Sequence, residues 1–155
     1  MIRFQANTEI DRPVEQVFAY LIDFENAPKW QSGVVTSKLA TPGPLRKGSK
    51  FDEVVRLGPW RMTTTCEITE VEGSRRAAFR TTSRGPVEYG GEFLLEHQGL
   101  GTKVTVSGTM FLKGLWRLLE PVMAGEIKKE TARELQRLKS ELEAPLAHEP
   151  RNATA

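Results

Sequence analysis

Three polar side chains stand at positions where a β-sheet would turn them toward an apolar interior. Glu53 lies two residues from Phe51 and Val55, in a segment that alternates between apolar and polar residues. Because successive side chains of a strand point to opposite faces, Glu53 is predicted to share the buried face with these neighbours. Tyr89 and Thr64 have the same inward parity in two further candidate strands. Such a carboxyl and hydroxyl group could orient a hydrophobic ligand, or act on it as general acid and base.

The inward placement of Glu53 depends on the register of its strand. A β-bulge near Gly48 or Gly58 would shift the strand by one residue and turn Glu53 into solvent. In the inward register, the carboxylate loses hydration, so its pKa should rise above the ordinary value of about 4.3. The sequence alone leaves both registers open.

The same parity argument, applied to each strand and to the start of the last helix, predicts a larger set of cavity residues. Aromatic and methionine side chains that face a helix are more often core than ligand wall, so ordinary core packing is the alternative interpretation. The candidate ligand-binding residues are Glu53, Val55, Trp60, Met62, Thr64, Phe79, Tyr89, Phe93, Met110, Trp116, Leu119 and Met123.

The elements that must position these residues follow from a change of hydrophobic period. Residues 2–10 alternate and predict a strand, whereas residues 14–22 and 23–30 predict two short helices. From residue 34 the period becomes two, and short turns rich in Gly and Pro separate the segments. Six further strands are predicted at 34–39, 50–57, 60–71, 75–83, 87–97 and 103–110. The predicted fold class is α+β, with a curved antiparallel sheet of seven strands.

The last third of the chain, from Gly114 to about Glu143, predicts one long amphipathic helix across the concave face of that sheet. Pro121 falls inside the pattern, and it removes one backbone hydrogen bond, so a kink is expected there. A sheet that curves around a helix leaves a gap, which is where a cavity is expected. The apolar stripe consists of Leu115, Leu119, Val122, Met123, Ile127, Thr131, Leu135, Leu138 and Leu142.

Composition limits the range of functions. The 155 residues predict one domain over 1–143 and a disordered tail over 144–155. The 22 basic and 20 acidic residues are too balanced to indicate nucleic-acid binding. No apolar run is long enough for a membrane span, and the start of the chain lacks the apolar region of a signal peptide. One cysteine, Cys66, excludes an internal disulfide, so the cytoplasm is the expected location.

The sequence carries no strong catalytic or cofactor motif. It lacks a nucleophile elbow, a phosphate-binding loop and a dinucleotide-binding glycine pattern. The two histidines are His97 and His148, so no metal site and no cofactor are expected. His97 next to a turn is interpreted as a surface residue, and Cys66 among threonines as a small buried side chain rather than a reactive thiol.

Five segments in this order resemble a known superfamily over about residues 2–143. They are IDRPVEQVF at 10–18, DFENAPKW at 23–30, KGSKF at 47–51, CEITEV at 66–71 and GTKVTV at 101–106. Together they resemble the START-like, helix-grip superfamily, and within it the bacterial polyketide cyclase/dehydrase-like (SRPBCC) branch. The resemblance implies a deep apolar cavity between the sheet and the C-terminal helix. Members of the superfamily include lipid carriers, polyketide aromatase/cyclases and quinone-binding proteins, so the resemblance implies a fold more sharply than a function.

Three functional hypotheses follow. The first is binding of a small hydrophobic molecule, which would be lipid-, polyketide- or isoprenoid-like. The second is a cyclase or dehydratase that uses Glu53 or Tyr89 as acid or base. The third is a protein-interaction module. Paired titratable groups with shifted pKa values inside the cavity would favour the enzyme. A lone carboxylate among apolar atoms would favour binding, and a filled interior with an exposed apolar patch would favour the third.

Overall fold

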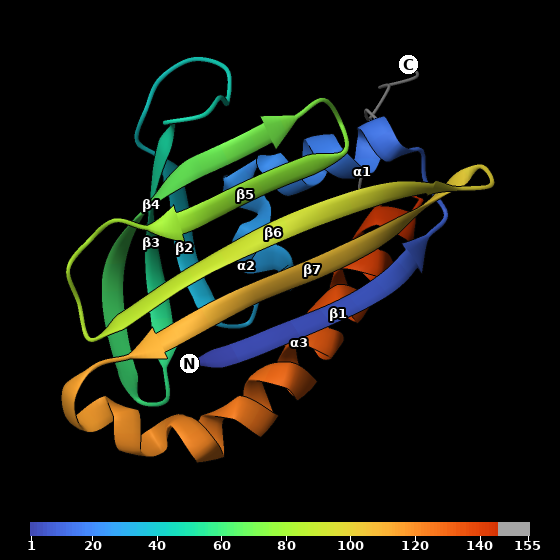
Figure 1. The fold of residues 1–155 in the computed structure, drawn as a ribbon. Helices are drawn as coiled ribbons and strands as arrows, with labels where there is room; N and C mark the ends of the chain where they lie inside the picture. The colour runs from blue at the N-terminus through green and yellow to red at the C-terminus, as the bar shows by residue number, and fades with distance from the viewer. Residues whose placement is uncertain (146–155) are drawn as a thin grey trace, which may run out of the picture.

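An alternating segment at the start of the chain forms the edge strand of a seven-stranded sheet. The computed structural model describes residues 1–145. The strand order is β1-β7-β6-β5-β4-β3-β2, and every neighbouring pair is antiparallel, as Figure 1 shows. The predicted antiparallel sheet of seven strands and the α+β fold class are therefore confirmed. The strands are β1 (Ile2–Ile10), β2 (Val34–Leu39), β3 (Lys50–Leu57), β4 (Trp60–Glu72), β5 (Arg76–Thr81), β6 (Val87–Gln98) and β7 (Gly101–Leu112).

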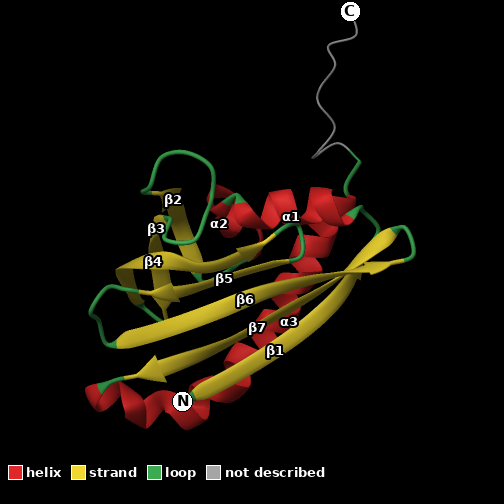
Figure 2. Ribbon diagram, turned by 45° about the horizontal axis from the view of Figure 1, so that its top comes forward, coloured by secondary structure: helices red, strands yellow, loops and turns green. Residues whose placement is uncertain are grey.

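Three short helical segments connect the two edge strands of the sheet. They are α1 (Val14–Ile22), the 3-10 turn η1 (Phe24–Asn26) and α2 (Ala27–Trp30). Pro13 precedes the first helix and Pro28 lies in the first turn of α2, where a missing N–H costs nothing. Because β1 and β2 lie at opposite edges, this connection crosses from one side of the sheet to the other. Figure 2 shows these helices at the same end of the sheet as the end of α3.

The C-terminal helical region is confirmed, but it consists of two helical types. A 3-10 segment, η2 (Gly114–Leu119), leads into the α-helix α3 (Glu120–Glu143). Pro121 lies in the first turn of α3, where the proline ring is tolerated. The expected kink is thus a change of helix type just before Pro121. Since a 3-10 helix turns by about 120° per residue rather than 100°, the apolar stripe does not continue along one face through η2.

The predicted stripe is correspondingly wrong at its start. Leu115 is 83% exposed, Leu119 is 42% exposed and Val122 is 78% exposed. Further along α3 the prediction holds, because Thr131, Leu135, Leu138 and Leu142 are buried. The second half of α3 therefore closes the core against the sheet, whereas its first half flanks an open space.

The main core lies beneath the second half of α3. It joins side chains of α1, the middle strands and α3, including Val17, Phe51, Ile68, Val104 and Leu138. A smaller cluster of Ile2, Val87 and Leu112 lies at the other end, near the start of α3. This unequal packing leaves room between the two clusters.

The register of β3 decides between the two alternatives left open by the sequence. Its pairing with β4 runs without interruption from Lys50↔Glu67 to Leu57↔Trp60. The register shifts lie elsewhere, in β2 between Val34 and Thr36 and in β4 between Ile68 and Glu70. Glu53 is consequently turned inward and is only 5% exposed, whereas Asp52 is exposed.

Two predictions concern the ends and surface of the chain. No helix within residues 1–145 is both long and apolar enough to cross a membrane. The tail predicted to be disordered lies, from residue 146 onward, outside the described residues.

Candidate ligand-binding cavity

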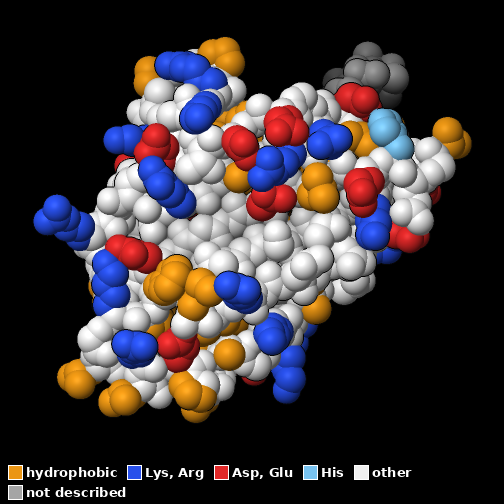
Figure 3. All heavy atoms as spheres, viewed as in Figure 1, with side chains coloured by type: hydrophobic (Ala, Val, Ile, Leu, Met, Phe, Trp, Pro, Cys, Tyr) orange, Lys and Arg blue, Asp and Glu red, His pale blue; other side chains and the backbone are white. Residues whose placement is uncertain are grey.

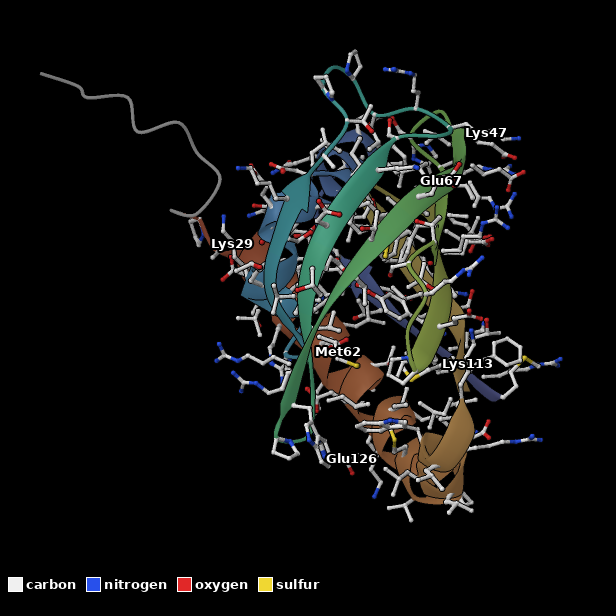
Figure 4. All side chains as sticks on the ribbon, turned by 90° about the vertical axis from the view of Figure 1, so that its left-hand side faces the viewer. Lys29, Lys47, Met62, Glu67, Lys113 and Glu126 are labelled. Atoms are coloured by element: carbon white, nitrogen blue, oxygen red, sulfur yellow. The ribbon has the colours of Figure 1, made fainter. Side chains whose placement is uncertain are left out.

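A cavity of about 510 Å³ lies between the concave face of the sheet and the first half of α3. Strand β1 and strands β3 to β7 supply its sheet wall, and the loop between α2 and β2 supplies one side. Figure 4 shows this end of the molecule, with Met62 on β4 near the start of α3 and Glu126 of α3 close to the β3–β4 turn. The cavity is thus bounded by elements distant in sequence that the sheet's curvature brings together.

Aromatic rings in contact with one another form the deeper wall of the cavity. Phe79 lies 5.8 Å from Phe93 between ring centroids, and Trp30 lies 6.0 Å from Phe93. Phe24 meets Phe79 edge-on at 6.1 Å. All four of these side chains line the cavity. Such tilted and edge-on contacts favour a fixed arrangement of rings, which gives the wall a defined shape.

Gly91 makes this aromatic arrangement possible. A β-carbon at Gly91 would lie 2.8 Å from Cζ of Phe79, which is closer than real atoms approach. Gly91 therefore leaves space for the ring of Phe79.

A short polar chain interrupts the apolar wall. The hydroxyl of Tyr89 donates a hydrogen bond of 2.7 Å to Oε2 of Glu53. The hydroxyls of Tyr89 and Thr64 are 3.0 Å apart and share a second hydrogen bond, and the Cys66 thiol donates weakly to Tyr89 at 3.6 Å. Glu53, Thr64 and Cys66 are all buried. The carboxyl group therefore reaches the cavity already hydrogen-bonded to a phenol that is itself held by a threonine.

Burial shifts the pKa values of this polar chain toward the neutral forms. Removal from water raises the pKa of Glu53, and the hydrogen bond from Tyr89 opposes that rise only in part. Burial, reinforced by the nearby Glu53, also raises the pKa of Tyr89. The same two causes raise the pKa of the Cys66 thiol to about 12, so this thiol stays protonated.

The predicted cavity residues divide into two groups. Thr64 is buried behind Tyr89 and is not on the wall itself. Trp60 and Trp116 are also away from the wall and instead pack against each other edge-on, with centroids 5.0 Å apart. Leu119 points away and is 42% exposed. The predicted residues that line the cavity are Glu53, Val55, Met62, Phe79, Tyr89, Phe93, Met110 and Met123.

Sequence reasoning missed the contributions of the short helices, of β1 and of the middle of α3. Phe24 and Trp30 come from η1 and α2, segments that the parity argument for strands did not cover. Phe4 of β1 has the inward parity that could have identified it. Glu126, Glu130 and Glu134 of α3 also line the cavity, and none of them belongs to the apolar stripe predicted for this helix.

The loops that flank the cavity contribute unequally to its wall. Leu57 and Gly58 of the β3–β4 turn line it, but the turn at residues 84–86 and the segment at 112–116 do not. The α2–β2 loop also lines the cavity. The backbone N–H of Ser32 donates to Oε1 of Glu134 at 3.0 Å, and its hydroxyl donates to Oε1 of Glu130 at 2.7 Å. Ser32 thus fastens this loop to α3 across the side of the cavity.

Metal ligation finds no support in the arrangement of side chains. Within residues 1–145, no group of three His, Cys, Asp or Glu side chains could hold a metal ion. His97 is exposed at the end of β6, and Cys66 is buried.

Comparison with protein families gives a match over residues 1–143 to the family described as polyketide cyclase / dehydrase and lipid transport. The chain belongs to this family. The START-like, SRPBCC assignment made from the sequence is therefore confirmed, and the family's two named activities span both enzymes and carriers. A comparison with curated protein sequences gives no match.

Solved structures of the same fold support the family assignment. A protein of Thermus thermophilus superposes with a TM-score of 0.75 at 19% identity, over 89% of this chain and 94% of that chain. A START superfamily protein from Mycobacterium smegmatis gives 0.75 at 12% identity, over 92% and 98%. The Zhui aromatase/cyclase from Streptomyces sp. R1128 gives 0.72 at 14% identity, over 91% and 93%. At these identities the likeness establishes the helix-grip fold alone.

Proposed function

We propose that this member of the polyketide cyclase / dehydrase and lipid transport family binds a neutral, hydrophobic small molecule in the cavity under α3. The observation that carries the proposal is the 2.7 Å hydrogen bond between Tyr89 and Glu53 in a wall made mostly of aromatic and aliphatic side chains. Ligand pockets commonly combine an apolar wall with a few fixed polar groups. A cavity of about 510 Å³ falls within the usual range of such pockets.

The charges around the cavity favour a neutral ligand over an anionic one. Four carboxyl groups line it, those of Glu53, Glu126, Glu130 and Glu134. Among the described residues, Arg56 is the one basic side chain on the wall. A ligand carboxylate placed against Glu53 would meet like charge or a buried acid, both of which disfavour it. A ligand hydroxyl or carbonyl could instead accept a hydrogen bond from protonated Glu53, and a hydroxyl could also donate to its ionised form.

An enzymatic role, as a cyclase or dehydratase on a polyketide-like substrate, is the second candidate. It is favoured by the presence of two titratable groups with raised pKa values, Glu53 and Tyr89, on the same cavity wall. Ionised Glu53 would remove a proton next to a ligand carbonyl, and the hydroxyl of Tyr89 would donate a hydrogen bond to the oxygen that gains charge. However, the two groups are joined to each other, so they offer one proton-sharing unit rather than a separated acid and base.

The binding proposal can be tested with ligands that differ only in their polar group. Native mass spectrometry of the protein purified from its own host identifies a retained ligand. Titration with an isoprenoid alcohol, and separately with the carboxylic acid of the same chain, measures the preference. We expect tighter binding of the alcohol near neutral pH. Tighter binding of the acid, or binding of neither compound together with an empty protein from the host, would contradict the proposal.

Two matched variants connect that binding to the cavity. Glu53→Gln keeps the size of the side chain but cannot ionise, so ligand affinity should change and lose its dependence on pH. Asp52→Asn makes the same chemical change on the opposite, exposed face of β3, where Asp52 accepts a hydrogen bond from Thr65. This control should leave affinity unchanged. Conversion of a polyketide-like substrate by the wild type, abolished in Glu53→Gln, would establish the enzymatic alternative.

A further inference from the structure

The segment that breaks the helical stripe exposes a row of apolar side chains. Leu115 is 83% exposed, Leu118 is 77% exposed and Val122 is 78% exposed. Leu119 adds a fourth exposed apolar side chain on the same segment, which comprises η2 and the start of α3. We call these four residues the mouth patch. Figure 3 shows hydrophobic side chains projecting at the lower edge of the molecule, where Figure 1 places this segment.

The mouth patch borders the cavity. Met123 lines the cavity and directly follows Val122 of the patch. On the other side, Gly58 of the β3–β4 turn lines the cavity, and Trp60 of the same turn packs on Trp116 of η2. Trp60 is itself 53% exposed, so an aromatic ring extends the apolar surface toward the β3–β4 turn. Contiguous exposed apolar surface of this kind marks an interaction site more often than isolated residues do.

Basic side chains accompany the patch. Arg117 lies within η2, and in the part of the chain that the structure describes it forms no ion pair. Lys128 and Lys129 follow in α3 and are exposed and likewise unpaired there. The acidic groups nearby are largely neutralised, because Glu120 pairs with the N-terminal amine of Met1 and Glu88 pairs with Lys113. The surface therefore combines protruding apolar side chains with an excess of positive charge.

We propose that the mouth patch docks this end of the protein onto an anionic lipid membrane. Leucine and valine side chains that protrude from a turn can insert among lipid acyl chains, and tryptophan favours the interfacial region. Arginine and lysine beside them attract anionic head groups. A protein partner would need a groove shaped to these projections, whereas a fluid membrane adapts to them. Docking would set the β3–β4 turn and the start of α3, which bound the cavity, against the lipid surface.

Vesicle flotation with the full chain tests this docking without any knowledge of the cavity ligand. Vesicles of phosphatidylcholine alone are compared with vesicles that also contain phosphatidylglycerol. We expect binding to the anionic vesicles that weakens as NaCl is added. The double variant Leu118→Ser/Val122→Ser should reduce binding by about tenfold or more, since two inserted aliphatic side chains are lost. Arg117→Glu should reduce binding to the anionic vesicles and make it less sensitive to salt.

Two variants provide matched controls at the opposite end of the sheet. Leu100 is 94% exposed in the β6–β7 turn, so Leu100→Ser removes an equally exposed leucine outside the patch. Lys47→Glu reverses an exposed charge in the β2–β3 connection, which Figure 4 places far from Glu126. Both should bind vesicles like the wild type.

Three results would overturn the proposal. One is that the wild type floats with neither kind of vesicle. Another is that the control variants lose binding as much as the patch variants do. The third is a combination of observations. The wild type self-associates in sedimentation, and Leu118→Ser/Val122→Ser abolishes this association. Neither the wild type nor the double variant binds vesicles. In that case the patch is an interface between copies of the chain. None of these results bears on ligand binding by Glu53 and Tyr89, so the two proposals fail independently.

Discussion

Tyr89 and Glu53 are joined by a 2.7 Å hydrogen bond although their strands, β6 and β3, are separated in the sheet by β4 and β5. The contact is possible because the sheet curves around the cavity and because β5 pairs with β6 only as far as Arg80↔Gly90. Tyr89 lies just beyond this point, where its backbone N–H is bonded to the side chain of Thr81 at 3.2 Å. The hydrogen-bonded pair and the curvature of the sheet therefore support each other.

The first prediction concerns this hydrogen bond. Tyr89→Phe removes the donor to a buried carboxyl group, and the loss of such a partner costs about 1–3 kcal/mol. We expect the free energy of unfolding, measured by urea denaturation at neutral pH, to fall by about this amount. Ligand affinity should fall as well, because Glu53 loses the group that orients it.

A double-mutant cycle separates the hydrogen bond from the rest of the Tyr89 ring. In the background of Glu53→Gln, Tyr89→Phe should cost less than in the wild type, because the hydrogen bond between Tyr89 and the Glu53 carboxyl group is then already absent. Equal costs in both backgrounds would show that the contact contributes no coupling energy.

The second prediction is the pH dependence that Glu53 imposes on stability. Burial raises its pKa in the folded protein above the unfolded value of about 4.3. The folded state then holds the proton more tightly than the unfolded state. The contribution of Glu53 to stability is therefore greatest below the unfolded pKa, and it decreases as pH rises through the interval up to the folded pKa.

Comparison with Glu53→Gln isolates this contribution from the other titrating groups. The stability of the wild type relative to this variant should fall across the interval and become constant above the folded pKa. Asp52→Asn, which changes an exposed carboxyl group, should give no comparable trend relative to the wild type. A constant difference between wild type and Glu53→Gln from acid to neutral pH would contradict the raised pKa.

The sequence predicted the sheet because its strands obey a strict period of two. That period also identified the inward face of β3, and the uninterrupted pairing with β4 keeps Glu53 on that face. The order of β2 to β7 followed from the turns between successive strands, which favour neighbouring antiparallel pairs, whereas the place of β1 beside β7 did not. The local pattern was therefore enough to predict a strand and its inward face wherever alternate residues are the ones buried in the folded protein.

The sequence-based predictions were wrong or incomplete where the helix type changed and where charged side chains of α3 line the cavity. Leu119 and its neighbours look like a continuation of the α3 stripe, but a 3-10 turn before Pro121 redirects them. Glu130 and Glu134 look like surface residues, and only the contact with Ser32 reveals their place beside the cavity. Neither the helix type nor a contact across about a hundred residues is encoded in a periodic pattern.

The third prediction concerns tryptophan fluorescence. The chain has three tryptophans. Trp30 lines the cavity, whereas Trp60 and Trp116 pack on each other beside it. In the variant Trp60→Phe/Trp116→Phe, Trp30 is the remaining emitter, and a bound ligand should still shift or quench its emission. An unchanged spectrum at a ligand concentration that saturates the protein by mass spectrometry would place the ligand elsewhere.

The fourth prediction concerns the fastening of the α2–β2 loop by Ser32. The Ser32 hydroxyl is the leading cause, ahead of Arg137 and Arg133, that lowers the pKa of Glu130 to about 2. Ser32→Ala removes this hydrogen bond but keeps the backbone N–H that bonds to Glu134. The pKa of Glu130, followed by NMR of its side-chain carboxyl, should therefore rise toward the ordinary value.

The same variant should also change how stability responds to acid. Because its pKa is lowered in the folded state, Glu130 stabilises the fold above the unfolded pKa of about 4.3, and this contribution is lost as pH falls toward about 2. Ser32→Ala should reduce that acid-dependent loss, and amide exchange at residues 31–34 should become faster because the loop is held by one bond fewer. Ser140→Ala is the matched control, since the Ser140 hydroxyl bonds only within α3, to the carbonyl of Gln136. If amide exchange speeds up equally in Ser32→Ala and Ser140→Ala, the serine does not fasten the loop. If the pKa of Glu130 stays near 2 in Ser32→Ala, the two arginines alone hold Glu130 ionised.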